Sequence, residues 1–347
     1  MKKLIAVLFI FAIGLSLIPL RSFATDDSIE VLPTMTTQSV TENRIWVGTF
    51  QIVWNEILEN IVKAPIKFVG FNSKMATDLN KKEFTKNNID ISAYYTKSGI
   101  VSPKLKKEIE KGIKKKFHEK SDILDMFDFS YQPNKLFVYA MLKKDFQFLS
   151  AFDKLPQGYF GKNRKPVQYF GIKDNSNSKL YKNVYVMFYN NDKDFAVKLY
   201  TKGKDEVLLY RTNNNETFAK SFADINQKEK NYKGNKNFVK DDTLMIPNIN
   251  LYKVANFGEL EGHNIANTNF RIDKTIETVD FKMNNEGIKL KSEAAAMVRC
   301  TCLEPIRGRS FSFNDNFVIF LIEKGQKVPY FAMRVHDVVS INKTGRK

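Results

Sequence analysis

The feature that most constrains the fold of this chain is a run of small residues near its C-terminal end. The run consists of Ser292, Glu293, Ala294, Ala295 and Ala296. Because Ala is depleted from β-strands, strand propensity does not explain three in succession ahead of strongly apolar sequence. Protein interiors resist added volume, so small side chains suit a segment that must enter between packed strands. The run indicates either a loop that can become a strand or one capped helical turn.

The N-terminus has the three parts of a secretory signal peptide. Lys2 and Lys3 precede an apolar run, Leu4–Leu20, and the small-x-small sequence Ser22-Phe23-Ala24 follows. We therefore expect residues 1–24 to be a signal peptide and the mature chain to be secreted, to an extracellular or cell-envelope location. An uncleaved membrane anchor is the alternative interpretation of the same apolar run. After cleavage we expect no membrane association.

The chain is basic, with 55 Lys and Arg against 38 Asp and Glu and a formal net charge of +17. Most of the excess is lysine spread along the sequence, which favours solubility and weak attraction to polyanions. No stretch interleaves basic and stacking aromatic residues as nucleic-acid modules do, so we expect no specific nucleic-acid partner.

Cysteine and histidine are scarce. Cys300 and Cys302 are the only two cysteines, so a disulfide framework cannot hold the fold together. Free thiols, a labile redox pair and an intermolecular bond all remain open for them. The three histidines lie far apart in sequence, and none has the spacing of a metal ligand pair. We therefore expect no metal site and no cofactor.

Helical patterns dominate the first third of the chain. Residues 25–43 are polar and aperiodic, which predicts a flexible leader. Residues 44–62 carry aromatic and aliphatic residues at helical spacing, so we expect an amphipathic helix there. A second helix is predicted near residues 73–84 and a strand at residues 89–95.

A basic helix is predicted to begin at Ser102-Pro103, where a capping residue precedes a proline at the first helical position. Leu105, Ile109, Ile113 and Phe117 form its narrow apolar seam. The remaining faces carry lysines that form either a solvated surface or a polyanion-binding patch. The candidates for that patch are Lys104, Lys107, Lys111, Lys114 and Lys115.

The rest of the chain is predicted to be mostly strand. The expected strands are residues 136–142, 183–190, 194–201, 206–212, 244–247, 275–283, 317–322 and 328–335, with a helix near residues 216–227. N-terminal helices followed by a large mixed sheet and C-terminal hairpins define an α+β class. No repeat and no clear boundary interrupts this order, so we expect residues 44–347 to form one domain.

Enzyme signatures are missing from the sequence. It contains no G-x-S-x-G elbow, no H-E-x-x-H, no G-x-x-x-x-G-K-[ST] loop and no strand-linked G-x-G-x-x-G. Asp241 and Asp242 lie in a lysine-rich stretch, where solvation explains the paired carboxylates better than acid–base catalysis. We therefore expect no catalytic residues and no enzymatic activity.

Several passages, in order, resemble the serpin family. They are IDISAYYTKSGIVSPKLKKEIEKGIKKKF, LFVYAMLKKDFQFLSAFDKL, DTLMIPNINL, VDFKMNNEG, SEAAAM and FNDNFVIFLIEKGQKVPYFAMRV. SEAAAM is similar to the family's hinge, T-E-A-A-A-A, and VDFKMNNEG to the strand before it. The sequence departs from the family at Ile288–Lys291, which look inserted, and Lys291 takes the place of the family's hinge glycine. A charged side chain there raises the cost of insertion if it is buried without a partner.

The resemblance implies an exposed reactive loop that a serine protease cleaves and that then inserts into the main sheet. In that interpretation Ser292–Ala296 form the hinge, and the bait lies among Arg299, Pro305, Ile306 and Arg307. Arginine bait implies a trypsin-like protease, and we expect the inhibitor to be a monomer. The alternative is a non-inhibitory, serpin-like secreted binding protein whose exposed loop is inert.

Overall fold

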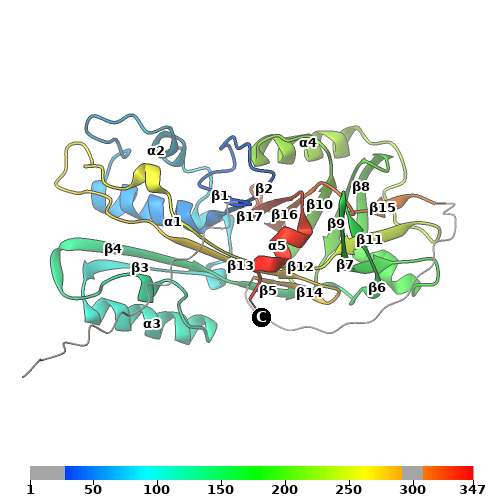
Figure 1. Cartoon of the computed structure of the whole chain (residues 1–347), viewed down its shortest axis with the longest axis horizontal. Coiled ribbons are helices and arrows are strands. Elements are labelled where there is room, and N and C mark those ends of the chain that lie inside the picture. Colours follow the sequence, from blue (N-terminus) through cyan, green and yellow to red (C-terminus); the bar gives the residue numbers. More distant parts are fainter. Residues whose placement is uncertain (1–27, 291–307, 347) are drawn as a thin grey trace, which may run out of the picture.

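Four β-sheets with helices packed on them make up the part of the chain that the computed structural model describes, residues 28–290 and 308–346. Figure 1 shows an elongated molecule with strands β3 and β4 and helix α3 at one end and strands β6, β7 and β15 at the other. Helices and sheets are not arranged as alternating βαβ units, so the α+β class expected from the sequence is confirmed. In the described ranges no helix is long and apolar enough to cross a membrane.

The largest sheet has seven strands and forms the centre of the core. In order across the sheet they are β1 (Ile29–Leu32), β2 (Asn43–Val47), β17 (Phe331–Val335), β16 (Phe317–Glu323), β10 (Asp205–Arg211), β9 (Asp194–Tyr200) and β8 (Val184–Asn191). Every residue of β16 and β17 is buried. Unbroken apolar runs of this kind are typical of strands covered on both faces.

Strands β1 and β2 correct two of the predictions made from the sequence. The leader expected at residues 25–43 is wrong over β1, which is largely buried and pairs in parallel with β2. The helix expected from Arg44 is wrong over β2 and begins only at Gly48, as α1 (Gly48–Glu56), continued by a π-helical turn, Ile57–Val62. The helical spacing misled because Arg44 and Trp46 are buried in the sheet by pairing with β17, which sequence periodicity does not report.

A smaller sheet covers one end of the molecule. Its strands, in order, are β15 (Ser310–Ser312), β11 (Thr243–Pro247), β7 (Asn163–Ile172) and β6 (Asp153–Phe160). Helix α4 (Phe218–Asn231) packs on β8, and α5 (Val338–Thr344) packs on β12. Helix α2 (Lys74–Leu79) is shorter than the predicted helix at residues 73–84 and is capped by Ser73.

The two remaining sheets share one continuous extended stretch. One sheet pairs β3 (Tyr94–Val101) with β4 (Gln132–Leu142). The other has the order β12 (Ile249–Ala255), β13 (Glu277–Met283), β14 (Gly287–Leu290) and β5 (Lys144–Gln147). Only Lys143 separates β4 from β5, so the stretch 132–147 belongs to both sheets. The strand predicted at residues 89–95 is wrong in position, because short helical turns precede Tyr94.

Helix α3 (Pro103–Phe117) covers the outer face of β3 and β4. Ser102 caps it by accepting a hydrogen bond from the Leu105 backbone N–H at 3.2 Å, as the sequence predicted. The apolar seam of the helix forms a second core cluster with Phe137 and Tyr139 of β4. On the opposite face of β4, helix α1 packs against the strand. Helix α1 also lines the region between β4 and β13.

Candidate functional site

Strand β14 lies between β13 and β5 and is antiparallel to both. It pairs with β13 only through two positions, Lys289 with Lys282 and Ile288 with Met283. It pairs with β5 along its whole length, from Gly287 opposite Gln147 to Leu290 opposite Lys144. Gly287 is required here, because a Cβ would lie 2.2 Å from the Phe146 carbonyl oxygen. The chain that leaves β13 therefore turns back at once and forms a strand inside the sheet.

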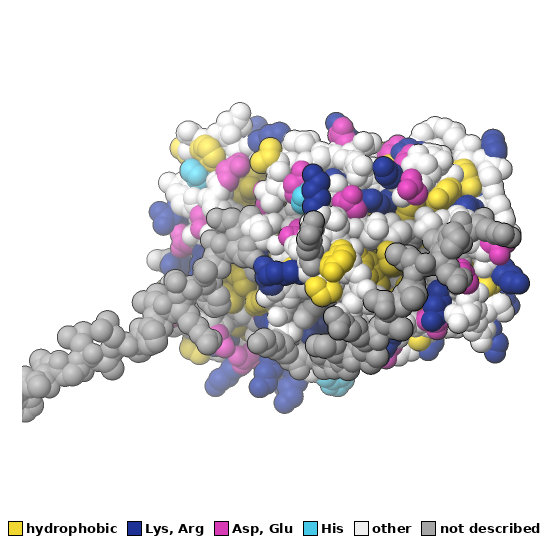
Figure 2. All heavy atoms as spheres, turned by 45° about the vertical axis from the view of Figure 1, so that its right-hand side comes forward, with side chains coloured by type: hydrophobic (Ala, Val, Ile, Leu, Met, Phe, Trp, Pro, Cys, Tyr) yellow, Lys and Arg dark blue, Asp and Glu magenta, His cyan; other side chains and the backbone are white. Residues whose placement is uncertain are grey.

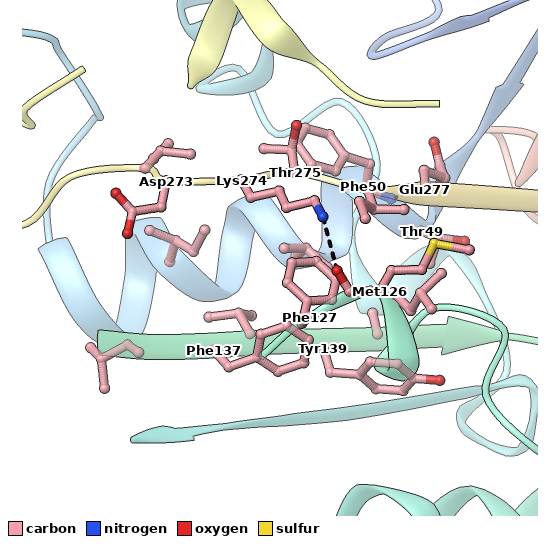
Figure 3. A pocket seen from close by; sticks show the side chains of 18 of the residues that line it. Thr49, Phe50, Met126, Phe127, Phe137, Tyr139, Asp273, Lys274, Thr275 and Glu277 are labelled. Carbon is pink, nitrogen blue, oxygen red and sulfur yellow. Dashed lines mark hydrogen bonds between the residues drawn. The ribbon is translucent and has the colours of Figure 1, made fainter. Parts of the chain in front are cut away.

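Beyond β14 the two neighbouring strands continue without a strand between them in the described residues. Strand β13 pairs with β12 from Glu277 to Met283, and β4 pairs with β3. Their facing edges, residues 275–280 and 138–143, line a cavity of about 650 Å³. We call this cavity the slot. Figure 3 shows β4 and the segment leading into β13 on its two sides, with α1 behind.

The walls of the slot are apolar and largely aromatic. On the inner side, helix α1 and the turn after it contribute Phe50, Val53, Trp54 and Ile57. The stretch before β4 contributes Met126, Phe127 and Phe129, of which the two phenylalanines pack with the cluster on the α3 side of β4. Trp54 is fully buried, and its indole N–H donates to Asn80 Oδ1 at 3.0 Å, so its polar atom is already satisfied. The wall can therefore receive apolar groups but offers them few hydrogen bonds.

Glu277 is the exception in this wall. It is 4 % exposed, and one of its carboxyl oxygens accepts a hydrogen bond from the Phe50 backbone N–H at 3.2 Å. Its other oxygen, Oε2, has no hydrogen-bond partner among the described residues. Burial raises the pKa of Glu277 to about 8, against which the Phe50 N–H acts only weakly. At neutral pH the side chain is therefore mainly a neutral carboxylic acid that can donate one hydrogen bond.

Two contacts cross the end of the slot that is distant from β14. Lys274 Nζ donates to the Met126 carbonyl oxygen at 2.9 Å and lies 5.1 Å from the centroid of the Phe127 ring. Lys135 Nζ lies 3.2 Å from Asp273 Oδ2. Both contacts join the stretch that leads into β13 to the side of the slot formed by β4, and Figure 3 shows the first as a dashed line. A strand that extended the full length of the slot would have to displace them.

A buried network of charged side chains lies at the end of the slot next to β14. Lys144 of β5, the register partner of Leu290, is ion-paired with Asp205 at 2.9 Å and with Glu323. Tyr330 donates its hydroxyl to Asp205 at 2.9 Å, and burial together with Asp205 raises the pKa of Tyr330 well above its usual value. Because Asp205 and Glu323 belong to β10 and β16, the network fixes β5 to the seven-stranded sheet.

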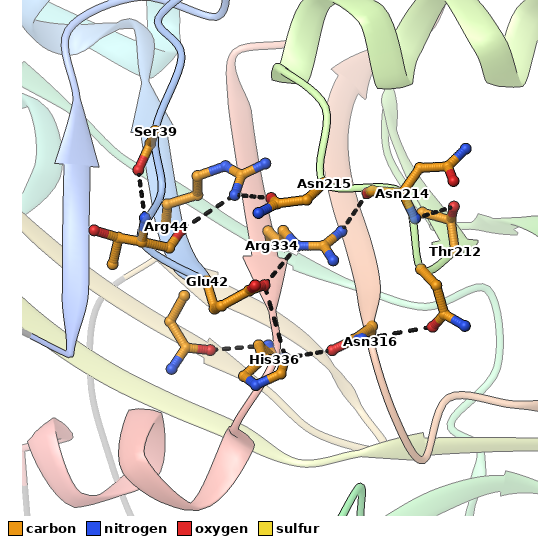
Figure 4. A network of polar contacts seen from close by, with 12 residues as sticks. Ser39, Glu42, Arg44, Thr212, Asn214, Asn215, Asn316, Arg334 and His336 are labelled. Atoms are coloured by element: carbon orange, nitrogen blue, oxygen red, sulfur yellow. Dashed lines mark hydrogen bonds and ion pairs between the residues drawn. The ribbon is translucent and has the colours of Figure 1, made fainter.

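A second polar network lies at one end of strands β2 and β17 of the seven-stranded sheet (Figure 4) and contains two buried arginines. Arg44 and Arg334 are register partners on β2 and β17. Arg44 donates to the Glu216 carbonyl oxygen at 2.6 Å, and Arg334 donates to the Asn214 carbonyl oxygen at 2.8 Å. Burial, with the neighbouring Arg334, lowers the pKa of Arg44 to about 10. The terminal guanidinium nitrogens donate mainly to backbone carbonyls, although the Nε atoms of both arginines have no hydrogen-bond partner among the described residues, so we assign this network a structural role.

The predicted site residues fall into two groups. The hinge (Ser292, Glu293, Ala294, Ala295, Ala296) and the bait region (Arg299, Pro305, Ile306, Arg307) lie outside the described residues. The five candidate lysines, Lys104, Lys107, Lys111, Lys114 and Lys115, are all exposed on α3. Figure 2 shows Lys and Arg side chains dispersed over one face, with a group at the lower edge.

The sequence did not reveal the slot or Glu277. The sequence predicts Glu277 only as part of a strand. It indicates that Ile288–Lys291 are inserted residues, whereas Ile288–Leu290 belong to strand β14. The one available signal was the polar sequence Asn284-Asn285-Glu286-Gly287 after an apolar run, which is typical of a hairpin turn. Within the described ranges, no group of three His, Cys, Asp or Glu side chains could hold a metal ion.

No protein-family model and no curated protein matches the chain. Among solved structures, Serpin48 of the insect Tenebrio molitor aligns at 12% identity over 83% of this chain and 95% of its own, with a TM-score of 0.44. Human thyroxine-binding globulin in complex with thyroxine aligns at 12% identity over 85% of this chain and 74% of its own, with a TM-score of 0.42. Human kallistatin aligns at 13% identity over 79% and 72%, with a TM-score of 0.42.

Because these TM-scores lie below 0.5, the proposals for this chain rest on its own strand arrangement. Passages that resemble serpins in sequence form β4 and β5, β11, β13, and the hairpin of β16 and β17. The strand before the hinge, β13, lies in the same sheet as β5, with β14 between them. The described residues form an α+β fold.

Proposed function

We propose that this protein is a secreted, serpin-like inhibitor of serine proteases, in which the hinge enters the slot after a protease has cut the loop beyond it. The observation that carries this proposal is the position of β14. The first residues after the turn at the end of β13 already pair with both neighbouring strands. Insertion of the hinge would therefore extend an existing strand and would not need to begin a new one.

The strand register supports the choice of small residues in the hinge. Extending the pairing of β14 with β13 brings Ala294 opposite Glu277. Extending its pairing with β5 along β4 brings the same residue opposite Ala140. Glu277 and Ala140 are buried on the inner face, toward α1. A side chain at position 294 would point into the slot, where a small one fits and a large one would meet close-packed neighbours.

Lys291 is less of an obstacle than its sequence position suggests. The same register brings Lys291 opposite Asp280 on β13 and opposite Lys143 on the other side. Residues 289 and 282 form the adjacent pair on the outer face, so position 291 also faces outward, because side chains alternate along a strand. A lysine at this position would have the Asp280 carboxylate beside it, which lowers the cost of placing it in the sheet. That gain is reduced by the like charge of Lys143 and by Arg346, which already lies 3.7 Å from Asp280.

The finer parts of the proposal concern partners. Arg299 and Arg307 are the bait candidates that fit a trypsin-like protease, whose specificity pocket carries an acidic residue. The signal peptide predicted at residues 1–24 supports secretion, and we propose that the mature chain acts as a monomer. The exposed lysines of α3 form a surface with which sulfated polyanions can interact weakly.

The test of this function is a covalent complex with the protease. The mature protein is incubated with trypsin, chymotrypsin, elastase and subtilisin, and the products are separated in SDS. A protease-sized increase in mass that survives SDS supports inhibition. The variant Ala294→Arg should be cut at the same bond and at the same rate but form no complex. Cleavage of the wild-type protein by every protease without any stable complex would contradict the proposal.

A second function is favoured by the contacts that cross the slot. Lys274 with Met126, and Lys135 with Asp273, hold its distant end together. These contacts favour a non-inhibitory secreted binding protein, in which cutting the inert loop causes no insertion. The melting temperature distinguishes the two functions, because an inserted strand adds hydrogen bonds and buried area whereas an inert cut loop adds neither.

A further inference from the structure

The slot has the dimensions and lining of a small-molecule site. Its volume of about 650 Å³ lies within the range of roughly 300–1,000 Å³ in which most ligand pockets fall. Its lining combines the aromatic side chains of Phe50, Trp54 and Phe127 with a small number of polar groups. Ligand sites are typically built in this way, with apolar walls for affinity and a few polar groups that orient the ligand.

Glu277 supplies a polar group that the protein itself leaves unused. Its Oε2 atom is buried and has no hydrogen-bond partner among residues 28–290 and 308–346. A buried polar atom without a partner is destabilising, because it has lost its hydrogen bonds to water. The side chain lines the cavity, in which a ligand could supply the missing hydrogen bond. No arginine or lysine pairs with this carboxyl group in the described residues, so the protein provides no charge that would keep it ionised.

The charges around the mouth of the slot do not favour an anionic ligand. Lys135 and Arg271 are both paired with Asp273, at 3.2 and 2.9 Å. Lys274 already donates to the Met126 carbonyl oxygen and contacts the Phe127 ring. These cations have partners, so an anionic ligand would have to compete for them. The inner wall is apolar and would not compensate an anion for its lost water.

We propose that the slot is a binding site for a small, uncharged, mainly aromatic molecule that accepts a hydrogen bond from Glu277. The apolar body lies against Phe50 and Trp54, and a carbonyl or ether oxygen of the ligand meets the carboxylic acid. This site does not depend on protease inhibition. If the hinge also inserts, ligand and hinge occupy the same edges of β13 and β4 and therefore exclude each other.

The neutral aromatic dye Nile red, which carries a ring carbonyl, is the probe. Its fluorescence is titrated with the mature full-length protein, with the anionic dye anilinonaphthalene sulfonate in parallel. Ala140→Phe fills the slot and should weaken Nile red binding at least about tenfold. Glu277→Leu should weaken it about fivefold to tenfold, because the hydrogen-bond donor is lost. Glu277→Gln keeps a donor and should bind within about twofold of wild type.

Ala219→Phe, an enlargement of a half-buried alanine on α4 away from the slot, is the matched control and should leave Nile red affinity unchanged. Circular dichroism and melting curves verify that each variant folds. If Ala140→Phe does not fold, the contrast between Glu277→Leu and Glu277→Gln decides. The site is ruled out if wild type does not bind Nile red, if filling the slot or losing Glu277 leaves the affinity unchanged, or if the anionic dye binds there more tightly. Failure of the covalent-complex assay alone would leave this site intact.

Discussion

Lys135 of β4 and Asp273, shortly before β13, form an ion pair of 3.2 Å across the end of the slot that is distant from β14. Both side chains are about half exposed, at 54% and 40%, so the pair contributes less than about 1 kcal/mol to overall stability. Its importance lies in its position. A hinge that extends beyond Ala296 reaches this pair and the Lys274 contact, so these contacts set how far a strand can enter.

Removing the contacts across the slot should ease insertion. Lys135→Ala combined with Lys274→Met should raise the fraction of protease trapped as complex relative to loop that is simply cut, because the trap must insert before the acyl-enzyme hydrolyses. The measurement is the number of inhibitor molecules consumed per protease inhibited. Lys97→Ala breaks a comparable exposed pair with Glu108, at 2.9 Å between β3 and α3, and should change nothing. An unchanged ratio in the double variant would show that these contacts do not limit insertion.

Glu277 should make stability depend on pH in a defined window. Its pKa is about 8 in the folded protein against 4.5 in an ordinary environment. Between these values the unfolded chain has lost the proton and the folded chain keeps it, so the free energy of unfolding falls as pH rises. It should level off above about pH 8. Glu277→Gln removes this fall and should be more stable than wild type at pH 7 by up to about 3 kcal/mol.

Urea unfolding between pH 5 and pH 9 measures this effect. Glu59→Gln, at an exposed carboxylate paired with Lys82, serves as the control and should follow the wild-type curve. Parallel curves for wild type and Glu277→Gln would mean that Glu277 is ionised in the folded protein at neutral pH.

The buried network under β5 should be sensitive to the loss of its only lysine. Lys144→Met removes the cation that Asp205 and Glu323 share and leaves two buried carboxylates close together. Breaking a buried pair in this way costs about 3–5 kcal/mol. Thermal or urea denaturation gives the value. Lys202→Met, which removes an exposed lysine that donates to Gln147 at 2.7 Å, should cost less than about 1 kcal/mol. A small effect at Lys144 would indicate that the carboxylates find other partners.

The α3 lysines can be tested as a polyanion surface. Replacing Lys104, Lys107, Lys111, Lys114 and Lys115 by Gln should lower the salt concentration that elutes the protein from a heparin column, because interactions between exposed charges are screened by salt. Five other exposed or half-buried lysines, at positions 162, 165, 173, 179 and 182, provide a variant with the same loss of charge. Equal shifts in the two variants would mean that retention depends on net charge and not on α3.

The sequence predicted the positions of helices and strands correctly where a capping residue marked the start of a helix or an apolar run marked a strand. Ser102 and Pro103 located the start of α3, and the run beginning at Phe317 located β16. Predictions failed where pairing partners lie far along the chain. The helix predicted at residues 44–62 fails at its start, where residues 43–47 form β2. Strand β17 supplies the backbone hydrogen bonds there, and the carbonyl groups of Glu216 and Asn214 accept from Arg44 and Arg334.

The candidate site could be predicted only in part. The small side chains of the hinge indicated a segment suited to insertion, but nothing in the sequence reports the separation of two strands. The slot exists because β13 and β4 diverge after β14, and the burial of Glu277 follows from that divergence and from α1 packing across it. A carboxyl group in an alternating strand pattern is normally assigned to the solvent face.

The central claim is that the slot accepts the hinge as a strand between β13 and β4. Amide hydrogen exchange tests it most directly, on intact protein and on protein cut in the loop by trypsin. Peptides covering residues 138–143 and 275–280 should become strongly protected after cleavage, whereas β12, already paired with β13, should not change. Equal exchange in the intact and cut forms at both edges of the slot would contradict insertion.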